Sequence, residues 1–162
     1  MTQLVQRSVW APREVVADRR VHMSINVKNL AQSVAFYRVF FDTNPAKVRE
    51  GYAKFSLDDP AINFTINEFP NSTEAPPSGH FGIQVKDTDS VTRAFERYKK
   101  HNFKITDESG VACCYAVQSK IWVADPDGFR WEIFVTTEAD AEEGCGPTCI
   151  CHEEFERSYA MS

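Results

Sequence analysis

Residues 21–29 read VHMSINVKN, and residues 79–87 read GHFGIQVKD, so one pattern occurs twice in the chain. Both copies share His-x-x-Ile-[Asn/Gln]-Val-Lys-[Asn/Asp]. The first copy alternates apolar and polar residues, which is typical of a half-buried β-strand. An internal repeat of this kind predicts two structural modules of the same design, and this repeat decides the fold.

A helix is predicted directly after the first copy of the repeat. Asn29 is placed as its N-cap, and Gln32, three residues on, completes a capping box. The helix is expected to end near residues 42–44, before a proline. Its apolar side is predicted to consist of four residues: Leu30, Val34, Tyr37 and Phe41.

Short strands are predicted from alternating runs bounded by turn residues. In the first module they cover residues 46–49, 53–57 and 62–67. The second module is expected to repeat the first, with a helix whose apolar face carries Val91, Ala94, Phe95 and Tyr98. Its later strands are placed at residues 104–107, 111–117, 120–123 and 129–136. The sequence therefore predicts an α+β fold of two βαβββ modules, with curved mixed sheets around a metal-binding cavity.

The chain divides into three parts on this interpretation. Residues 21–137 form the domain, with modules at 21–69 and 79–137. Residues 1–20 have no clear period and are interpreted as an N-terminal extension. Residues 138–162 begin with acidic residues and are interpreted as a C-terminal tail that contains three cysteines.

Composition places the 162-residue chain among ordinary globular domains, with 43% hydrophobic and 25% charged residues. Its net charge of -5 argues against a nucleic-acid partner, which requires a basic face. No apolar run is long enough for a membrane span, and no secretion signal is recognisable. The five cysteines are odd in number and do not resemble a secreted disulfide framework, so a reducing cytoplasm is expected.

Strand parity brings two histidines and one carboxylate to the polar faces of the sheets. Alternate side chains of a strand point to opposite faces, so His22 and His80 lie opposite the apolar residues of their strands. The apolar residues of the last strand send Glu132 to the matching face. Around a shared cavity these three would form the facial triad of an iron(II) oxygenase, with open positions for substrate and dioxygen. Alternatively each histidine is an ordinary surface or hydrogen-bonded residue; their equivalent places in the repeat favour the metal site.

Cys113 and Cys114 are adjacent thiols. Neighbouring cysteines form a disulfide only with strain, because consecutive Cα atoms lie about 3.8 Å apart and an unstrained bridge needs roughly 5.5 Å. Two thiolates in one loop can instead bind a soft, thiophilic atom together. The alternative is that one cysteine packs as a small hydrophobe while the other points to water.

These features resemble the vicinal oxygen chelate superfamily of glyoxalases, bleomycin-resistance proteins and extradiol dioxygenases. The resemblance rests on the paired modules, on His22, His80 and Glu132, and on residues 122–132, which read WVADPDGFRWE. It covers roughly residues 21–137.

A narrower resemblance is to the carbon–arsenic lyases, also named cadmium-induced proteins. It rests on Cys113-Cys114-Tyr115-Ala116 and on the segments at residues 52–55 and 59–64. The resemblance implies a non-haem Fe(II) dioxygenase that cleaves the carbon–arsenic bond of trivalent organoarsenicals, such as methylarsonous acid and aromatic arsenicals, to arsenite. It implies iron held by His22, His80 and Glu132, arsenic held by Cys113 and Cys114, and dioxygen as the second substrate.

Further residues are weaker candidates. Asn63, Lys120 and Tyr115 are expected to line the pocket; Asn63 lies on the strand that corresponds in the first module to that of Glu132, and both Asn63 and Lys120 are equally well explained as ordinary sheet residues. The tail contains three cysteines, Cys145, Cys149 and Cys151. They are interpreted as accessory sites for arsenite or cadmium, or alternatively as oxidisable thiols of a flexible tail. Their spacing does not match that of structural zinc sites.

Two other functions stay open on the sequence alone. A non-catalytic arsenic- or cadmium-binding protein would need the thiols but no dioxygen. A glyoxalase-like isomerase or an extradiol dioxygenase would need the triad but not the thiol pair. The resting metal, iron or manganese (or nickel or cobalt), and a homodimeric state are likewise open.

Overall fold

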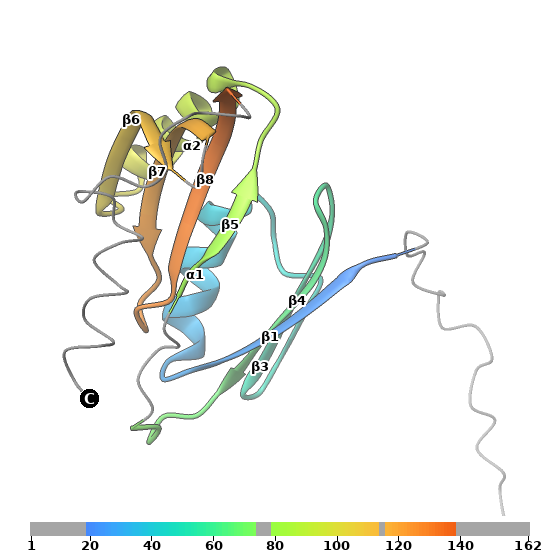
Figure 1. Cartoon of the computed structure of the whole chain (residues 1–162). Coiled ribbons are helices and arrows are strands. Elements are labelled where there is room, and N and C mark those ends of the chain that lie inside the picture. Colours follow the sequence, from blue (N-terminus) through green and yellow to red (C-terminus); the bar gives the residue numbers. More distant parts are fainter. Residues whose placement is uncertain (1–18, 74–78, 114–115, 139–162) are drawn as a thin grey trace, which may run out of the picture.

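The computed structural model describes residues 19–73, 79–113 and 116–138, and it shows one helix and one four-stranded sheet in each module (Figure 1). The first module contains β1 (Val21–Val27), α1 (Leu30–Phe40), β2 (Lys47–Arg49), β3 (Tyr52–Asp58) and β4 (Ala61–Glu68). The second contains β5 (Phe81–Gln84), α2 (Thr88–Lys100), β6 (Ile105–Cys113), β7 (Ala116–Ala124) and β8 (Arg130–Glu138). The predicted tail, nearly all of the predicted extension and Tyr115 lie outside the described residues.

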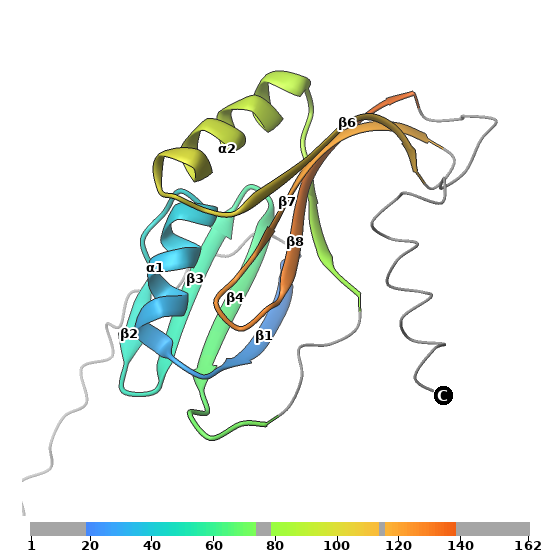
Figure 2. The same ribbon diagram turned by 90° about the vertical axis from the view of Figure 1, so that its left-hand side faces the viewer.

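Both sheets have the same topology. The strand orders are β1-β4-β3-β2 and β5-β8-β7-β6, and the first strand of each module pairs in parallel with the last. The other pairs are antiparallel. Figure 2 shows that β6, β7 and β8 bend strongly along their length. The prediction of an α+β fold built from two βαβββ modules with curved mixed sheets is confirmed.

Helix α1 begins where the sequence predicts, after Asn29, and α2 begins after an equivalent N-cap, Asp87, that was not predicted. Asn29 Oδ1 accepts a hydrogen bond from the backbone amide of Gln32 at 2.9 Å, and Asp87 Oδ1 accepts one from that of Ser90 at 2.8 Å. These N-caps occupy equivalent positions in the repeat and satisfy amides that have no partner within the helix. The end of α1 was predicted a few residues too late: the helix ends at Phe40, and Asp42 adopts φ 53°.

The predicted apolar face of α1 was only partly right. Its buried residues are Ser33, Phe36, Tyr37 and Phe40. The other predicted residues are only partly buried: Leu30, Val34 and Phe41. The second module causes the difference, because Phe36 stacks on Phe103 with ring centroids 4.6 Å apart and Phe40 stacks on Tyr98 at 5.7 Å. In α2, Val91, Ala94 and Tyr98 are buried as predicted, with Phe95 partly buried.

The strand predicted at residues 111–117 is wrong. β6 (Ile105–Cys113) runs continuously through the predicted break at residues 108–110, and Cys113 pairs with Ala116 at the start of antiparallel β7. The register shifts between Ser109 and Val111, which marks a β-bulge that the sequence presented as a break. Cys113 therefore lies at the end of β6, next to the start of antiparallel β7.

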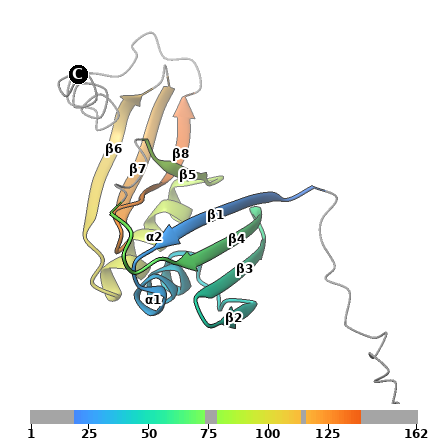
Figure 3. The same cartoon turned by 90° about the horizontal axis from the view of Figure 1, so that it is seen from below.

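A single hydrophobic core spans both modules, which lie against each other in Figure 3. Trp131 of β8 is buried among aromatic rings of the first module. Its ring centroid lies 4.8 Å from that of Phe40, 5.9 Å from Phe64 and 6.1 Å from Tyr37. Aromatic contacts of this kind add to the free energy gained by burying apolar surface.

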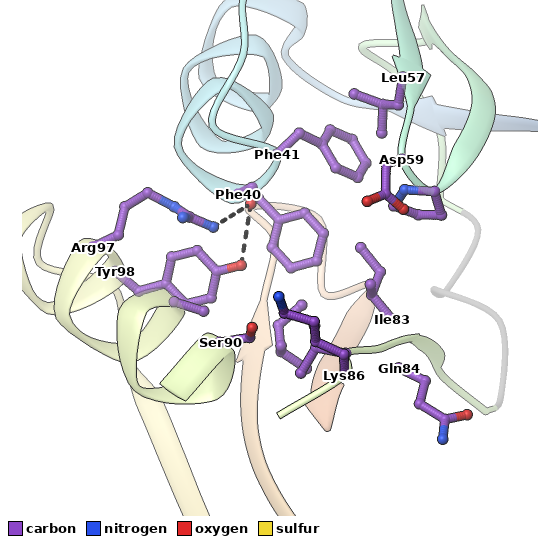
Figure 4. Close-up of a pocket in the computed structure, with 14 residues that line it drawn as sticks. Phe40, Phe41, Leu57, Asp59, Ile83, Gln84, Lys86, Ser90, Arg97 and Tyr98 are labelled. Atoms are coloured by element: carbon purple, nitrogen blue, oxygen red, sulfur yellow. Dashed lines mark hydrogen bonds between the residues drawn. The ribbon is translucent and has the colours of Figure 1, made fainter. Parts of the chain in front are cut away.

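Helix α2 also caps the C-terminal end of α1. The Arg97 guanidinium donates to the carbonyl oxygens of Val39 at 2.9 Å and Phe40 at 3.1 Å, and the Tyr98 hydroxyl donates to the Phe40 carbonyl at 3.1 Å (Figure 4). Carbonyls at a helix end have no partner within the helix and carry partial negative charge. A cation from one module thus stabilises the helix of the other.

A buried polar network joins the modules through the same core. The Tyr37 hydroxyl donates to Asp125 Oδ2 at 2.8 Å and accepts from Trp131 Nε1 at 3.2 Å. Asp125 Oδ1 accepts the backbone amides of Asp127 and Phe129, which holds the turn between β7 and β8. Burial raises the pKa of the Asp125 carboxyl, although the hydrogen bond from Tyr37 lowers it again in part.

Replacing Tyr37 with phenylalanine is expected to lower the free energy of unfolding by about 2 kcal/mol at neutral pH, because a hydrogen bond to a buried charged group is lost. The raised pKa of Asp125 means that its contribution to stability is complete below about pH 4 and declines as pH rises through its folded pKa. Tyr37→Phe raises that pKa further. Denaturant unfolding of both proteins between pH 4 and pH 8 should therefore show a deficit that grows with pH.

Tyr98→Phe is the matched control. Its hydroxyl is also buried and bonded, but to the Phe40 carbonyl instead of a carboxylate. Burial raises the pKa of Tyr98 to about 12, outside the range tested. The loss of stability in Tyr98→Phe should be constant from pH 4 to pH 8. A constant deficit in Tyr37→Phe as well would show that Asp125 does not depend on Tyr37.

Candidate metal centre

The polar face of the sheet β5-β8-β7-β6 carries a buried carboxylate. In β8, Trp131, Ile133 and Val135 are buried in the core, so Glu132 points to the opposite face, as predicted from parity. The register places Glu132 between Gly82 of β5 and Trp122 of β7. Glu132 is nevertheless only 8% exposed. A charged group held away from water needs a partner or a ligand.

His80 and Lys120 are the charged or chargeable neighbours of this carboxylate. Glu132 Oε1 lies 3.6 Å from His80 Nε2, and Oε2 lies 3.3 Å from the Lys120 ammonium. Lys120 is 2% exposed, so both members of the second pair are buried. Oε2 is shielded from solvent, and among the described residues no donor makes a well-aligned hydrogen bond to it. The carboxylate thus has one oxygen directed to His80 and the other to Lys120.

The charge balance at Glu132 favours the ionised form. Burial by itself would raise the pKa of the Glu132 carboxyl, but the hydrogen bond with His80 and the charges of Lys120 and His80 together lower it. A carboxylate that stays ionised in a buried site keeps its lone pairs available to a cation.

Trp122 supports the imidazole of this pair. The rings of His80 and Trp122 meet edge to face, with centroids 4.8 Å apart and planes at 81°. The indole is held by a hydrogen bond from Nε1 to Glu108 Oε2 at 2.9 Å, and its ring faces the Arg130 guanidinium at 5.0 Å and the Lys120 ammonium at 5.4 Å. Sequence reasoning assigned no role to Trp122 or Glu108.

His22 lies on the polar face of the other sheet. Its Nδ1 is 3.1 Å from the backbone carbonyl of Asn63 on β4. A carbonyl can only accept, so Nδ1 carries the proton and Nε2 keeps its lone pair. Histidines that bind metals are commonly oriented by this kind of bond. Within the described ranges, no group of three or more His, Cys, Asp or Glu side chains is close enough to hold a metal ion, so the triad with His22 stays a prediction.

Two cavities lie along the junction of the modules. One, of about 600 Å³, is lined by β1, by β4 and by Gly82, Ile83 and Gln84 around β5, the strands that carry or follow the two histidines. The other, of about 420 Å³, is lined on the core side by residues such as Phe40, Ile83 and Tyr98 (Figure 4). None of the predicted metal ligands is among the described residues that line either cavity.

The remaining sequence candidates are placed as follows. Lys120 is at the site, against Glu132. Asn63 is beside His22, with its side-chain oxygen buried and without a hydrogen-bond partner in the described part of the chain. Cys113 ends β6, whereas Cys114 and Tyr115 lie outside the described residues, as do Cys145, Cys149 and Cys151.

The His80–Glu132 pair has properties that suit a metal ion. Two ligand atoms bound to one ion at about 2.1 Å can be no more than about 4.2 Å apart, and the observed 3.6 Å meets that limit. The lowered pKa of the buried carboxyl keeps it ionised, which agrees with a cation site on the side of Oε1. Imidazole with carboxylate is a donor set that suits divalent iron.

Comparison with known proteins identifies the family. A family model described as "Glyoxalase/Bleomycin resistance protein/Dioxygenase superfamily" matches residues 19–133. The chain belongs to this superfamily, as the sequence resemblance predicted. A solved glyoxalase/bleomycin resistance protein/dioxygenase from Alicyclobacillus acidocaldarius superposes with a TM-score of 0.59 at 13% identity, covering 75% of this chain and 93% of that one, which shows the shared fold.

Two curated relatives are more similar in sequence. A "Trivalent organoarsenical cleaving enzyme" from Bacillus sp. (strain MD1) is 40% identical over 134 residues, which are 82% of this chain and 83% of the relative. The "Cadmium-induced protein CadI" of Mycobacterium bovis is 35% identical over 129 residues, 79% of this chain and 83% of the relative. In the part of the chain that the structure describes, no helix has the length and hydropathy to cross a membrane.

Lys120→Met is expected to destabilise the metal-free protein at pH 7 by about 3 kcal/mol, because it leaves Glu132 buried without its cation. The lowered pKa of Glu132 means that its stabilising contribution is present above its unfolded pKa, about 4.3, and is lost as pH falls through the folded value. Removing Lys120 raises that pKa. Thermal unfolding should show a deficit at pH 7 that narrows toward pH 4, while Lys104→Met, at an exposed lysine, should match the parent protein throughout.

Proposed function

We propose that this protein is an Fe(II)-dependent dioxygenase that cleaves the carbon–arsenic bond of trivalent organoarsenicals, such as methylarsonous acid and trivalent aromatic arsenicals, and releases arsenite. The observation that carries the proposal is the 40% identity, over 82% of this chain, to a relative named as a trivalent organoarsenical cleaving enzyme. The buried His80–Glu132 pair on the polar face supports a metal-dependent reaction.

His80, Glu132 and His22 are the proposed iron ligands. Bound iron would supply a centre at which dioxygen is activated. His80 contributes an imidazole fixed edge-on against Trp122, and Glu132 contributes Oε1 while Lys120 occupies the side of Oε2. His22 contributes the ring nitrogen left available by its bond to the Asn63 carbonyl. Asn63 and Lys120 would then line the pocket beside the ligands.

Cys113 and Cys114 are the proposed substrate clamp. Trivalent arsenic is soft and bonds to thiolates, which matches two adjacent thiols in a reducing compartment. Cys113 ends β6 and pairs with Ala116 at the start of β7, and β7 carries Lys120 and Trp122 on the same face as Glu132. Fixing arsenic there would hold the substrate for an intramolecular attack, and good positioning can contribute several kcal/mol to catalysis. Tyr115 would line the same loop, and the tail cysteines Cys145, Cys149 and Cys151 would act as accessory thiols.

Oxygen consumption with methylarsonous acid and Fe(II), with arsenite measured as product, tests the proposal. The parent protein should consume dioxygen and release arsenite in step. Glu132→Ala should lose iron and turnover together, whereas Cys113→Ser and Cys114→Ser should keep iron but lose substrate capture. His101→Ala, at the exposed C-cap of α2, is the control and should behave as the parent protein.

Retained turnover in Glu132→Ala would contradict its role as an iron ligand. Normal cleavage by both cysteine variants would contradict the clamp. Dioxygen consumption with a catechol but not with the arsenical would instead indicate an extradiol dioxygenase on the same scaffold.

The identity to a cadmium-induced protein favours one alternative, a non-catalytic protein that sequesters arsenic or cadmium. Such a protein would bind arsenite or Cd(II) through its thiols and would consume no dioxygen. Binding of Cd(II) without any arsenite release in the assay above would favour this alternative.

A further inference from the structure

Gly82 lies directly opposite Glu132 in the parallel pair β5 and β8. A Cβ atom placed on Gly82 would lie 2.9 Å from both Cγ and Oε1 of Glu132, and 3.3 Å from Cε1 of Phe134. Real Cβ atoms essentially never approach other atoms to less than 3.0 Å. The Glu132 side chain therefore occupies the space where any other residue at position 82 would have its side chain.

The backbone at Gly82 does not itself require glycine. The described glycines with positive φ are Gly51, Gly79 and Gly128, and Gly82 is not among them. Glycine within a strand weakens it, because glycine loses more conformational entropy and packs no side chain. The strand conformation thus does not explain a glycine at position 82. The close approach of the Glu132 carboxylate explains it.

The first module provides an internal comparison. Ser24 holds the place in β1 that Gly82 holds in β5, and it lies opposite Thr65 of β4. Thr65 is thus the counterpart of Glu132, and no carboxylate crosses β1 at this position. In the second module a buried carboxylate lies opposite a glycine, Glu132 opposite Gly82. In the first module neither is present at the equivalent positions, where Thr65 lies opposite Ser24.

The carboxylate has little room to move away from position 82. Its Oε2 already lies 3.3 Å from the buried Lys120 ammonium, and Trp122 flanks it on β7. Its Oε1, the atom a new Cβ would press on, is the atom that faces His80 at 3.6 Å. A side chain at position 82 would have to displace the oxygen of the proposed ligand pair.

We propose that Gly82 is a positioning residue: its missing side chain lets the Glu132 carboxylate lie across β5 with Oε1 facing His80. The structure alone supports the role of Gly82 in placing the carboxylate. The effect of Gly82 on metal binding also rests on the proposed function. No sequence feature of the metal ligands themselves identifies this position. An isolated glycine at a polar-face position of a strand, which indicates close approach of another group, is the signal.

The first test is a double-mutant cycle on the thermal stability of the metal-free protein. Gly82→Ala should lower the midpoint of thermal unfolding when Glu132 is present. In the Glu132→Ala background, the same substitution should be neutral or stabilising, because the clash is gone and alanine suits a strand better than glycine. Gln84→Ala, on the same strand and face, is the control and should have the same effect in both backgrounds. Equal effects of Gly82→Ala in both backgrounds would overturn the proposal.

The second test measures affinity for Co(II), followed by its visible absorption. Gly82→Ala should bind Co(II) about 10- to 100-fold more weakly than the parent protein, the range expected when the support of a metal ligand is lost. Gly82→Val, which is bulkier but favours strands, should bind more weakly still, and Gln84→Val should bind normally.

The two proposals fail separately in this experiment. Unchanged Co(II) affinity in Glu132→Ala would overturn Glu132 as a metal ligand and leave the stability cycle to decide the role of Gly82. Weak binding by Glu132→Ala together with normal binding by Gly82→Ala would overturn the positioning role and leave the metal site intact.

Discussion

The packing of Trp131 between the modules is the constraint on which the rest of the structure depends. Its ring contacts four aromatic residues of the first module, and its Nε1 donates to the Tyr37 hydroxyl that holds Asp125. Successive residues of a strand point to opposite faces, so fixing Trp131 in the core fixes Glu132 on the polar face. A shift of β8 by one residue would reverse both, placing a carboxylate in the core and an indole at the site. The inter-module core and the candidate metal centre are therefore set by one register.

Much of the fold could be predicted from the sequence, because the internal repeat and the alternation of apolar and polar residues can be read directly from it. The repeat predicted both modules, and the N-cap residue Asn29 predicted the start of α1. The errors occurred where another part of the chain decides. The apolar residues of α1 surround most of the helix, and only Phe103 and α2 determine that Phe36 and Phe40 are buried. The β-bulge in β6 follows from pairing with β7, which the sequence of β6 alone does not reveal.

Part of the candidate site could also be predicted from the sequence. Parity alone sent His80 and Glu132 to one face, and the structure has them 3.6 Å apart. Whether His22 joins them depends on how two sheets are placed relative to each other, and no periodicity encodes that placement. Trp122 and Glu108 were missed because their importance arises from cross-strand neighbours. Gly82 was readable in principle, since its strand alternates regularly and then omits a side chain on the polar face.

The two sheets share a topology but carry different groups at equivalent positions of their polar faces, most clearly at Glu132 and its counterpart Thr65. On the polar face of the first sheet, Thr65 is neutral, and the Asn67 side-chain amide donates an exposed hydrogen bond to Ser24 Oγ at 3.0 Å. The second sheet holds Glu132 and Lys120 largely out of water, an arrangement whose desolvation cost exceeds what packing alone would justify. Such a cost is tolerated where the charges have a task. The second module also omits a side chain at Gly82 beside the same carboxylate, so it gives up strand stability as well. The buried charge pair and the missing side chain at Gly82 both lie beside Glu132, whereas the equivalent residues of the first module, Thr65 and Ser24, show neither feature. This difference supports the proposal that Glu132 has a functional role.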